Sequence, residues 1–318
     1  MKLESPTVVE TEIGGRTLRI EIGKVAKLAN AAVLATYGGT TVLATVVRAD
    51  PRPGLDFFPM QVDYREKLSA GGKFPGGFRK REGAPNEKEV LTMRMIDRPI
   101  RPLFPDGFIE EVQIQCWVMS HDGENDADVI AGTAASAALA LSDCPFEGPL
   151  ATVRVGRIFD EDDNITHVIN PTVSQLEFSD VDLVLSGHRD GMNMIEVGAA
   201  EIPEDELIDC IKFGETHIAS ILDLIEELVG KAGQEKRLGN LVLVPDEIMT
   251  KCREVCEDDL TEARQIPGKA DRSARVAEIK KAFLDGYFDV KADATPGVHQ
   301  DSEKARKQAS EAFRTLEK

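Results

Sequence analysis

Short stretches of alternating apolar and polar residues follow one another through the first 50 residues. Alternation with a period of two is typical of strands that bury one face. The glycine pairs Gly14-Gly15 and Gly38-Gly39 separate these stretches and favour tight turns. The pattern predicts strands at Val8–Ile13, Thr17–Ile22, Ala32–Tyr37 and Thr41–Val47.

Residues 51–107 have a different character, because proline, glycine and charged residues interrupt the pattern. We expect mostly loop here, with one short helix at Glu87–Met95. Loops carried by a folded scaffold are where function is most often found.

Strand and helix patterns alternate after this stretch. Ala131–Leu141 is an alanine-rich helix suited to close packing on a sheet, and Glu204–Val229 has the helical spacing of a long sheet-covering helix. Further strands are predicted at Val112–Met119, Ala151–Val155, Asp182–Ser186 and Met192–Val197.

The strand pattern ends at Gly230 and a polar connector follows at Lys231–Gly239. Beyond it the periodicity predicts helices at Asp246–Arg264, Ser273–Phe288 and Ser302–Leu316. A length of 318 residues suits two domains. We therefore predict a first domain of strands and helices at residues 1–238 and an all-helical domain at residues 239–318.

The chain is acidic, with 56 Asp and Glu against 38 Lys and Arg and a net charge of −18. This balance argues against a domain coated in positive charge that binds duplex DNA. No apolar run is long enough for a membrane span, and the first residues lack the apolar stretch of a secretory signal, so a cytoplasmic protein is expected. The five cysteines have no C-x-x-C spacing and fit reduced thiols.

Common catalytic motifs are missing from the sequence. No two glycines stand two residues apart, which excludes G-x-G-x-x-G, and no Gly-Lys pair is followed by Ser or Thr. The five histidines are widely separated, without H-E-x-x-H, and no serine lies in G-x-S-x-G. Nothing in these patterns proposes a hydrolytic triad or a zinc site.

One basic segment stands out in the loop-rich region. Between Met60 and Arg101 ten Lys and Arg face six Asp and Glu, so this window carries +4 while the rest carries −22. At its centre, Gly71–Gly83 combines five glycines and four cations with Phe74 and Phe78. Cations neutralise phosphates and aromatic rings stack on unpaired bases, so single-stranded nucleic acid is a suitable ligand. A solvated basic loop whose phenylalanines pack back on the core is the alternative.

A second cationic segment follows at Ile96–Pro105. Its three prolines restrict the backbone that presents Arg98 and Arg101. The alternative is that Asp97 simply pairs with one of these arginines.

These segments together resemble the bacterial polynucleotide phosphorylase family. The resemblance runs through Pro75–Pro85 (PGGFRKREGAP) and Leu91–Pro105 (LTMRMIDRPIRPLFP), and continues at residues 135–142, 145–149 and 169–172. It implies an α+β fold in which an RNase PH-type core of mixed β-sheets packed with helices is followed by a small all-helical linker domain. Family members of full length carry a second core, a KH domain and an OB-fold domain.

The resemblance implies that this chain alone is inactive and supplies no catalytic or metal-binding residue. In the family, phosphate and Mg²⁺ bind in the second core, at a serine-rich turn and paired aspartates. Here the matching turn is Asp122–Asp126, whose acidic residues would repel phosphate. Asp182 matches one aspartate, but Leu176 and Val184 stand where its acidic partner and a lysine would be.

The resemblance also implies how RNA is bound. The family loop that matches Phe78–Arg81 lines the pore of a homotrimeric ring and usually reads Phe-Phe-Arg-Arg, whereas this chain has Phe-Arg-Lys-Arg. One aromatic side chain of the family pattern is thus replaced by a cationic one, Arg79. The residues expected to bind single-stranded RNA are Phe78, Arg79, Lys80, Arg81, Arg94, Arg98 and Arg101.

The leading hypothesis is the first part of a 3′-to-5′ phosphorolytic exoribonuclease of mRNA degradation, with phosphate and nucleoside diphosphates as partners of the full-length enzyme. The alternative is a free-standing, non-catalytic RNA-binding ring subunit that resembles inactive exosome members. A phosphorolytic enzyme active on its own is the third hypothesis.

Overall fold

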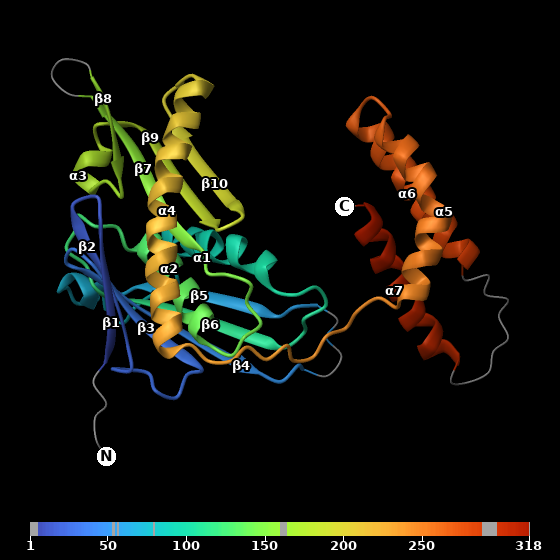
Figure 1. Cartoon of the computed structure of the whole chain (residues 1–318), viewed down its shortest axis with the longest axis horizontal. Helices are drawn as coiled ribbons and strands as arrows, with labels where there is room; N and C mark the ends of the chain where they lie inside the picture. The colour runs from blue at the N-terminus through green and yellow to red at the C-terminus, as the bar shows by residue number, and fades with distance from the viewer. Residues whose placement is uncertain are drawn as a thin grey trace. The chain divides into compact units, whose positions relative to one another are not determined.

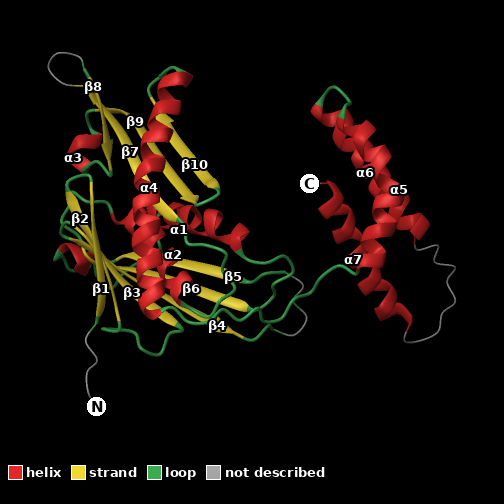
Figure 2. Ribbon diagram, in the orientation of Figure 1, coloured by secondary structure: helices red, strands yellow, loops and turns green. Residues whose placement is uncertain are grey.

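The computed structural model describes residues 6–52, 55, 57–78, 80–159, 164–287 and 298–317. The chain divides into two compact units, Met1–Leu241 and Val242–Lys318 (Figure 1). The first combines two β-sheets with helices and the second contains only helices in its described part (Figure 2). The mixed α+β fold expected from the sequence is confirmed.

A six-stranded sheet forms one layer of the first unit. Its strand order is β1-β2-β3-β4-β6-β5, and every neighbouring pair is antiparallel except β5 and β6. The strands are β1 (Thr7–Ile13), β2 (Arg16–Ile22), β3 (Ala31–Tyr37), β4 (Thr40–Ala49), β5 (Met60–Glu66) and β6 (Glu111–Ser120). Five of them were predicted from the sequence.

Strand β5 was not predicted within residues 51–107, for which the sequence predicts mostly loop with one short helix. Met60, Val62 and Tyr64 are buried and alternate with polar residues, which is the pattern of an edge strand with one buried face. The strand lies parallel to β6, so its pairing depends on a segment 52 residues later in the chain, as in the pair Met60 and Val112. Its seven residues between proline-rich and glycine-rich neighbours gave only a weak signal.

A four-stranded antiparallel sheet forms a second layer, with the order β10-β9-β7-β8. Its strands are β7 (Ala151–Phe159), β8 (Ile165–Ile169), β9 (Ser179–His188) and β10 (Gly191–Ala199). Strand β8 and the short helix α3 (Val173–Leu176) were not predicted. Both are short and incompletely buried, which explains the weak pattern.

Helix α2 (Ala127–Leu141) lies at the centre of the first unit, where it contacts β3, β4 and β7. All of its residues are buried, and their small side chains let both sheets approach closely. At Gly132 an added Cβ would lie 2.7 Å from Oγ1 of Thr152, so this contact requires glycine. Helix α4 (Glu204–Ala232) packs on β1, β7 and β9 (Figure 1).

Helix α1 (Glu87–Ile100) packs on β5 and α2 and is longer than the predicted Glu87–Met95. Pro99 lies in its last turn, and directly after Ile100 the chain forms the short helix η2 (Arg101–Leu103). The short helix η1 (Leu68–Gly71) follows β5.

The second unit contains α5 (Asp246–Arg264), α6 (Lys269–Tyr287) and α7 (Val298–Glu317). Its core includes Ile248, Leu260, Phe283 and Phe313. The predicted helix end at Phe288 lies outside the described residues. Among the described helices, none combines the length and apolar composition needed to cross a bilayer.

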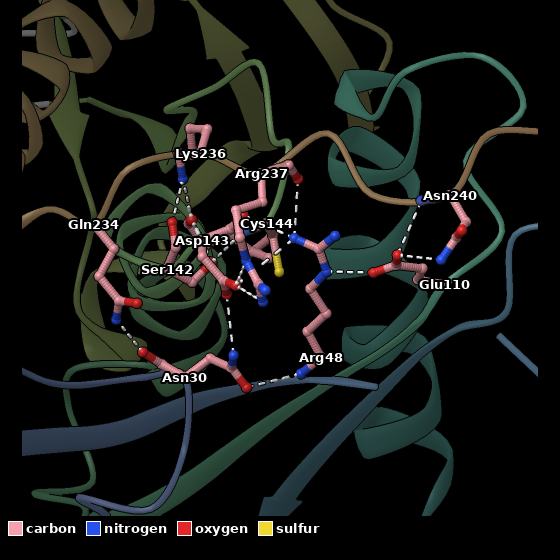
Figure 3. A network of polar contacts seen from close by, with 11 residues as sticks. Asn30, Arg48, Glu110, Ser142, Asp143, Cys144, Gln234, Lys236, Arg237 and Asn240 are labelled. Atoms are coloured by element: carbon pink, nitrogen blue, oxygen red, sulfur yellow. Dashed lines mark hydrogen bonds and ion pairs between the residues drawn. The ribbon is translucent and has the colours of Figure 1, made fainter. Parts of the chain in front are cut away.

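The predicted polar connector at Lys231–Gly239 is helical up to Ala232 and irregular beyond it. We call residues 233–241, which pack on the first unit, the strap. Helix α4 continues to Ala232, and the strap then covers the C-terminal end of α2 (Figure 3). Nζ of Lys236 donates hydrogen bonds of 2.7–2.8 Å to the carbonyls of Leu139, Ala140 and Ser142. A helix end leaves its last carbonyls without the usual intrahelical donors, and the Lys236 ammonium supplies donors at this end of α2.

Further contacts hold the strap, among them those made by Arg48 and Asn240 (Figure 3). Nη1 of Arg48 on β4 donates to the carbonyls of Asp143 and Arg237, both at 2.9 Å. The backbone N–H of Asn240 donates to Oε1 of Glu110 at 2.9 Å. The first unit therefore extends to Leu241.

Candidate functional site

The glycine-rich segment of residues 72–85 forms a loop whose two ends meet at Leu68. The carbonyl of Leu68 accepts a 2.9 Å hydrogen bond from the N–H of Lys73, and its own N–H donates to Oε1 of Glu82 at 3.1 Å. Nη2 of Arg65 donates to the carbonyl of Gly83 at 2.9 Å. A glycine at the turn, Gly72, has a φ of 69°, which is unfavourable for other residues. We call residues 72–85 the basic loop.

Glu89 fixes the base of the basic loop and is 3% exposed. Its Oε1 accepts from the N–H of Glu66 at 2.8 Å, and its Oε2 accepts from the N–H of Asn86 at 2.7 Å. Asn86 caps α1 in return, since its Oδ1 accepts from the N–H of Glu89 at 2.8 Å. The sequence pattern Asn-x-x-Glu is a recognisable capping box, so this anchor could have been found from the sequence.

The residues predicted at the tip of the basic loop project into solvent. Phe78 is fully exposed, with a relative exposure of 104%, and Lys80 and Arg81 are also exposed. Arg79 lies outside the described residues. Within the part of the chain that the structure describes, neither Lys80 nor Arg81 has a carboxylate partner.

Helix α1 begins directly after the basic loop and presents Arg94 and Arg98 on its outer face. Both side chains are exposed and lack a carboxylate partner among the described residues. Their Cα atoms lie about 12 and 18 Å along the helix axis from its N-cap. The loop cations and these two arginines therefore belong to one continuous stretch of the chain, residues 72–98.

Arg101 differs from these residues because its guanidinium is engaged within the protein. Nε and Nη2 donate to the carboxylate of Asp97 at 3.0 and 2.6 Å. Nη1 donates to the carbonyl of Phe58 at 3.2 Å and Nη2 to that of Met60 at 3.1 Å. Arg101 therefore joins the end of α1 to the start of β5 and has fewer donors left for a ligand.

The segment Asp122–Asp126 is the one that the resemblance aligns with a phosphate-binding turn. In this chain its backbone N–H groups bind the side-chain carboxylate of Asp122. The carboxylate of Asp122 accepts from the N–H groups of Gly39, Glu124 and Asn125 at 2.7–2.9 Å. Burial opposes its ionisation, but the hydrogen bonds from Asn125, Glu124 and Gly39 outweigh it and hold the pKa of Asp122 well below its usual range. The carboxylate of Asp122 therefore occupies backbone N–H donors that a bound phosphate would need.

Asp182 is likewise paired within the protein. Its carboxylate lies 3.0 Å from Nε of Arg154, whose Nη2 lies 2.7 Å from Asp128. Leu176 belongs to α3, and Val184 is buried in β9. In the described residues, no three His, Cys, Asp or Glu side chains are grouped so that they could hold a metal ion. All five cysteines are free and buried.

Comparisons with known proteins decide the family. A model of the 3′ exoribonuclease family, domain 1, matches residues 14–145, and the model of its domain 2 matches residues 148–216. The chain belongs to the 3′ exoribonuclease family. It is 47% identical over 282 residues to a polyribonucleotide nucleotidyltransferase of Nitrobacter winogradskyi, and 46% identical over 280 residues to one of Bacillus subtilis.

These alignments cover 88% of the chain but only 38% and 39% of the two relatives, so the chain spans about two fifths of their length. The resemblance read from the sequence is confirmed. A crystal structure of rice (Oryza sativa) Rrp46 matches with a TM-score of 0.52 and 14% identity, covering 72% of this chain and 96% of that one. That likeness concerns the fold alone.

Proposed function

We propose that this chain is the RNA-guiding part of a polynucleotide phosphorylase, which releases nucleoside diphosphates from the 3′ end of RNA with inorganic phosphate. In this proposal the basic loop and the outer face of α1 bind single-stranded RNA. Phosphate and Mg²⁺ bind in the second core of the enzyme, where the reaction takes place. Three copies of the enzyme assemble around the RNA in the cytoplasm.

The observation that carries this proposal is the set of cations without carboxylate partners in the described chain. Lys80, Arg81, Arg94 and Arg98 are exposed and unpaired although the net charge is −18. Exposed cations without a carboxylate partner also occur elsewhere among the described residues, as at Lys251 and Arg253 of α5, but those of the basic loop stand beside the fully exposed ring of Phe78. Unpaired cations beside an exposed aromatic ring suit a phosphate backbone with unstacked bases.

A salt titration of RNA binding tests the proposal. Fluorescence anisotropy with a labelled oligoadenylate should show affinity falling steeply with salt. The triple change of Arg79, Lys80 and Arg81 to alanine should flatten the slope of log K against log salt by about 2, since each lost phosphate contact contributes about 0.7. Phe78→Ala should cost roughly 1–3 kcal/mol of binding free energy.

The matched control removes cations from the helical unit. Lys251→Ala with Arg253→Ala lowers the net charge in the same direction but changes two exposed residues of α5. This variant should keep the wild-type slope. An unchanged slope in the triple variant, or wild-type protein that does not bind, rejects the proposal.

A further inference from the structure

A second phenylalanine of the basic loop is almost as exposed as Phe78. Phe74 has a relative exposure of 94%, and no ring contact joins it to any other described aromatic side chain. The chain packs other phenylalanines against one another, since the rings of Phe58, Phe104 and Phe108 form a cluster with centroids 4.6–5.6 Å apart. A ring left in water forgoes the free energy of burial and keeps its face free to stack on a ligand.

The backbone beside Phe74 is held in place. The N–H of the preceding residue, Lys73, donates to the carbonyl of Leu68 at 2.9 Å, and the N–H of Gly72 donates to the carbonyl of Ser69 at 3.1 Å. Pro75 restricts the backbone on the other side. Phe74 therefore projects from the anchored rim of the loop, whereas Phe78 projects from its tip.

The chemistry around Phe74 suits an unpaired base next to a phosphate. Lys73 is exposed and has no carboxylate partner in the described part of the chain. Any of the four bases can stack on an aromatic face, and a neighbouring cation binds the phosphate backbone of the nucleic acid. At positions 78–81 the chain offers only one aromatic ring, so a strand held there has a single stacking surface.

We propose that Phe74 is a second base-stacking residue, which binds a base of the same single-stranded RNA next to the one on Phe78. This inference rests on the proposed RNA-binding function. A strand held by both rings is fixed at the rim and at the tip of the basic loop, and Lys73 binds its backbone phosphate.

Paired binding measurements with two probes test this inference. The probes are a labelled oligoadenylate and an abasic oligomer of the same length, which keeps the phosphates but has no bases. Phe74→Ala should weaken binding of oligoadenylate by at least about fivefold. It should leave the binding of the abasic oligomer unchanged, and Phe74→Tyr should restore the wild-type affinity.

The control variant is Phe178→Ala, which removes another exposed ring, with a relative exposure of 73%, outside the basic loop. It should leave both affinities unchanged. The inference is overturned if Phe74→Ala binds oligoadenylate like the wild type, if it weakens both probes equally, or if its only effect is altered self-association in sedimentation. If Phe78→Ala weakens binding and Phe74→Ala does not, this inference fails alone. If the wild type binds neither probe, the proposed function fails as well.

Discussion

Arg98 and Arg101 lie three residues apart and have different surroundings. Arg101 makes four hydrogen bonds to Asp97 and to the carbonyls of Phe58 and Met60, whereas Arg98 is exposed and unpaired among the described residues. Arg101→Ala should therefore lower the free energy of unfolding by about 2 kcal/mol. Arg98→Ala should change it by less than about 0.5 kcal/mol and should weaken RNA binding. Urea unfolding and anisotropy on both variants check this, and equal stability losses would contradict it.

Asp122 contributes stability that depends on pH. Its pKa in the folded protein lies below that of the unfolded chain, so the carboxylate stabilises the fold above about pH 4. That contribution is lost as the pH falls below this value. Asp122→Ala should cost about 2 kcal/mol of unfolding free energy at pH 7 and clearly less at pH 3. Urea unfolding at both pH values measures the difference, with exposed Asp106→Ala as the control. A cost independent of pH would refute the assignment.

The sequence predicts the basic loop and its cations because composition is a local property. It leaves open whether Asp97 pairs with an arginine, and the structure shows that Asp97 pairs with Arg101. The carbonyl partners of Arg101 could not be predicted, since they precede and begin β5, a strand that the sequence did not indicate. Contacts between segments far apart in the chain leave no local signal.

At the scale of elements, helices and strands with a full periodic pattern could be predicted, and short ones could not. The ends of α5 match the prediction because Pro245 precedes its first turn and Pro267 follows its last. Strand β8 has five residues, and four of them are exposed or half-buried, so it lacks the alternation of apolar and polar residues by which a strand is recognised. The strap was predicted as a polar connector because its residues are polar. The structure shows that one of these polar residues, Lys236, binds the carbonyls at the end of α2, a contact that composition does not reveal.

Lys236 tests whether the strap stabilises the first unit. Lys236→Met keeps most of the side-chain volume but leaves the carbonyls of Leu139, Ala140 and Ser142 without this donor. We expect a loss of about 2 kcal/mol in the free energy of unfolding. Lys231→Met, which removes an exposed ion pair with Glu227, should cost less than about 0.5 kcal/mol. Chemical unfolding compares the two, and similar losses would show that the strap is not required.

At the scale of the whole molecule, this chain is expected to lack the activity of the enzyme. Asp122 occupies backbone donors that an anion would need, and Asp182 is paired with Arg154. The purified chain should therefore release no ADP from poly(A) in the presence of phosphate and magnesium. Phosphate-dependent release of ADP that Asp182→Asn abolishes would show an active site in this chain.

The central claim is that single-stranded RNA binds to the basic loop and the outer face of α1. Ultraviolet cross-linking of an oligoadenylate containing 4-thiouridine, followed by mass spectrometry of the peptides, tests it most directly. We expect cross-links in residues 72–98, lost at high salt because the contacts are largely ionic. Cross-links confined to the helical unit or to the four-stranded sheet, with none in residues 72–98, would contradict the account.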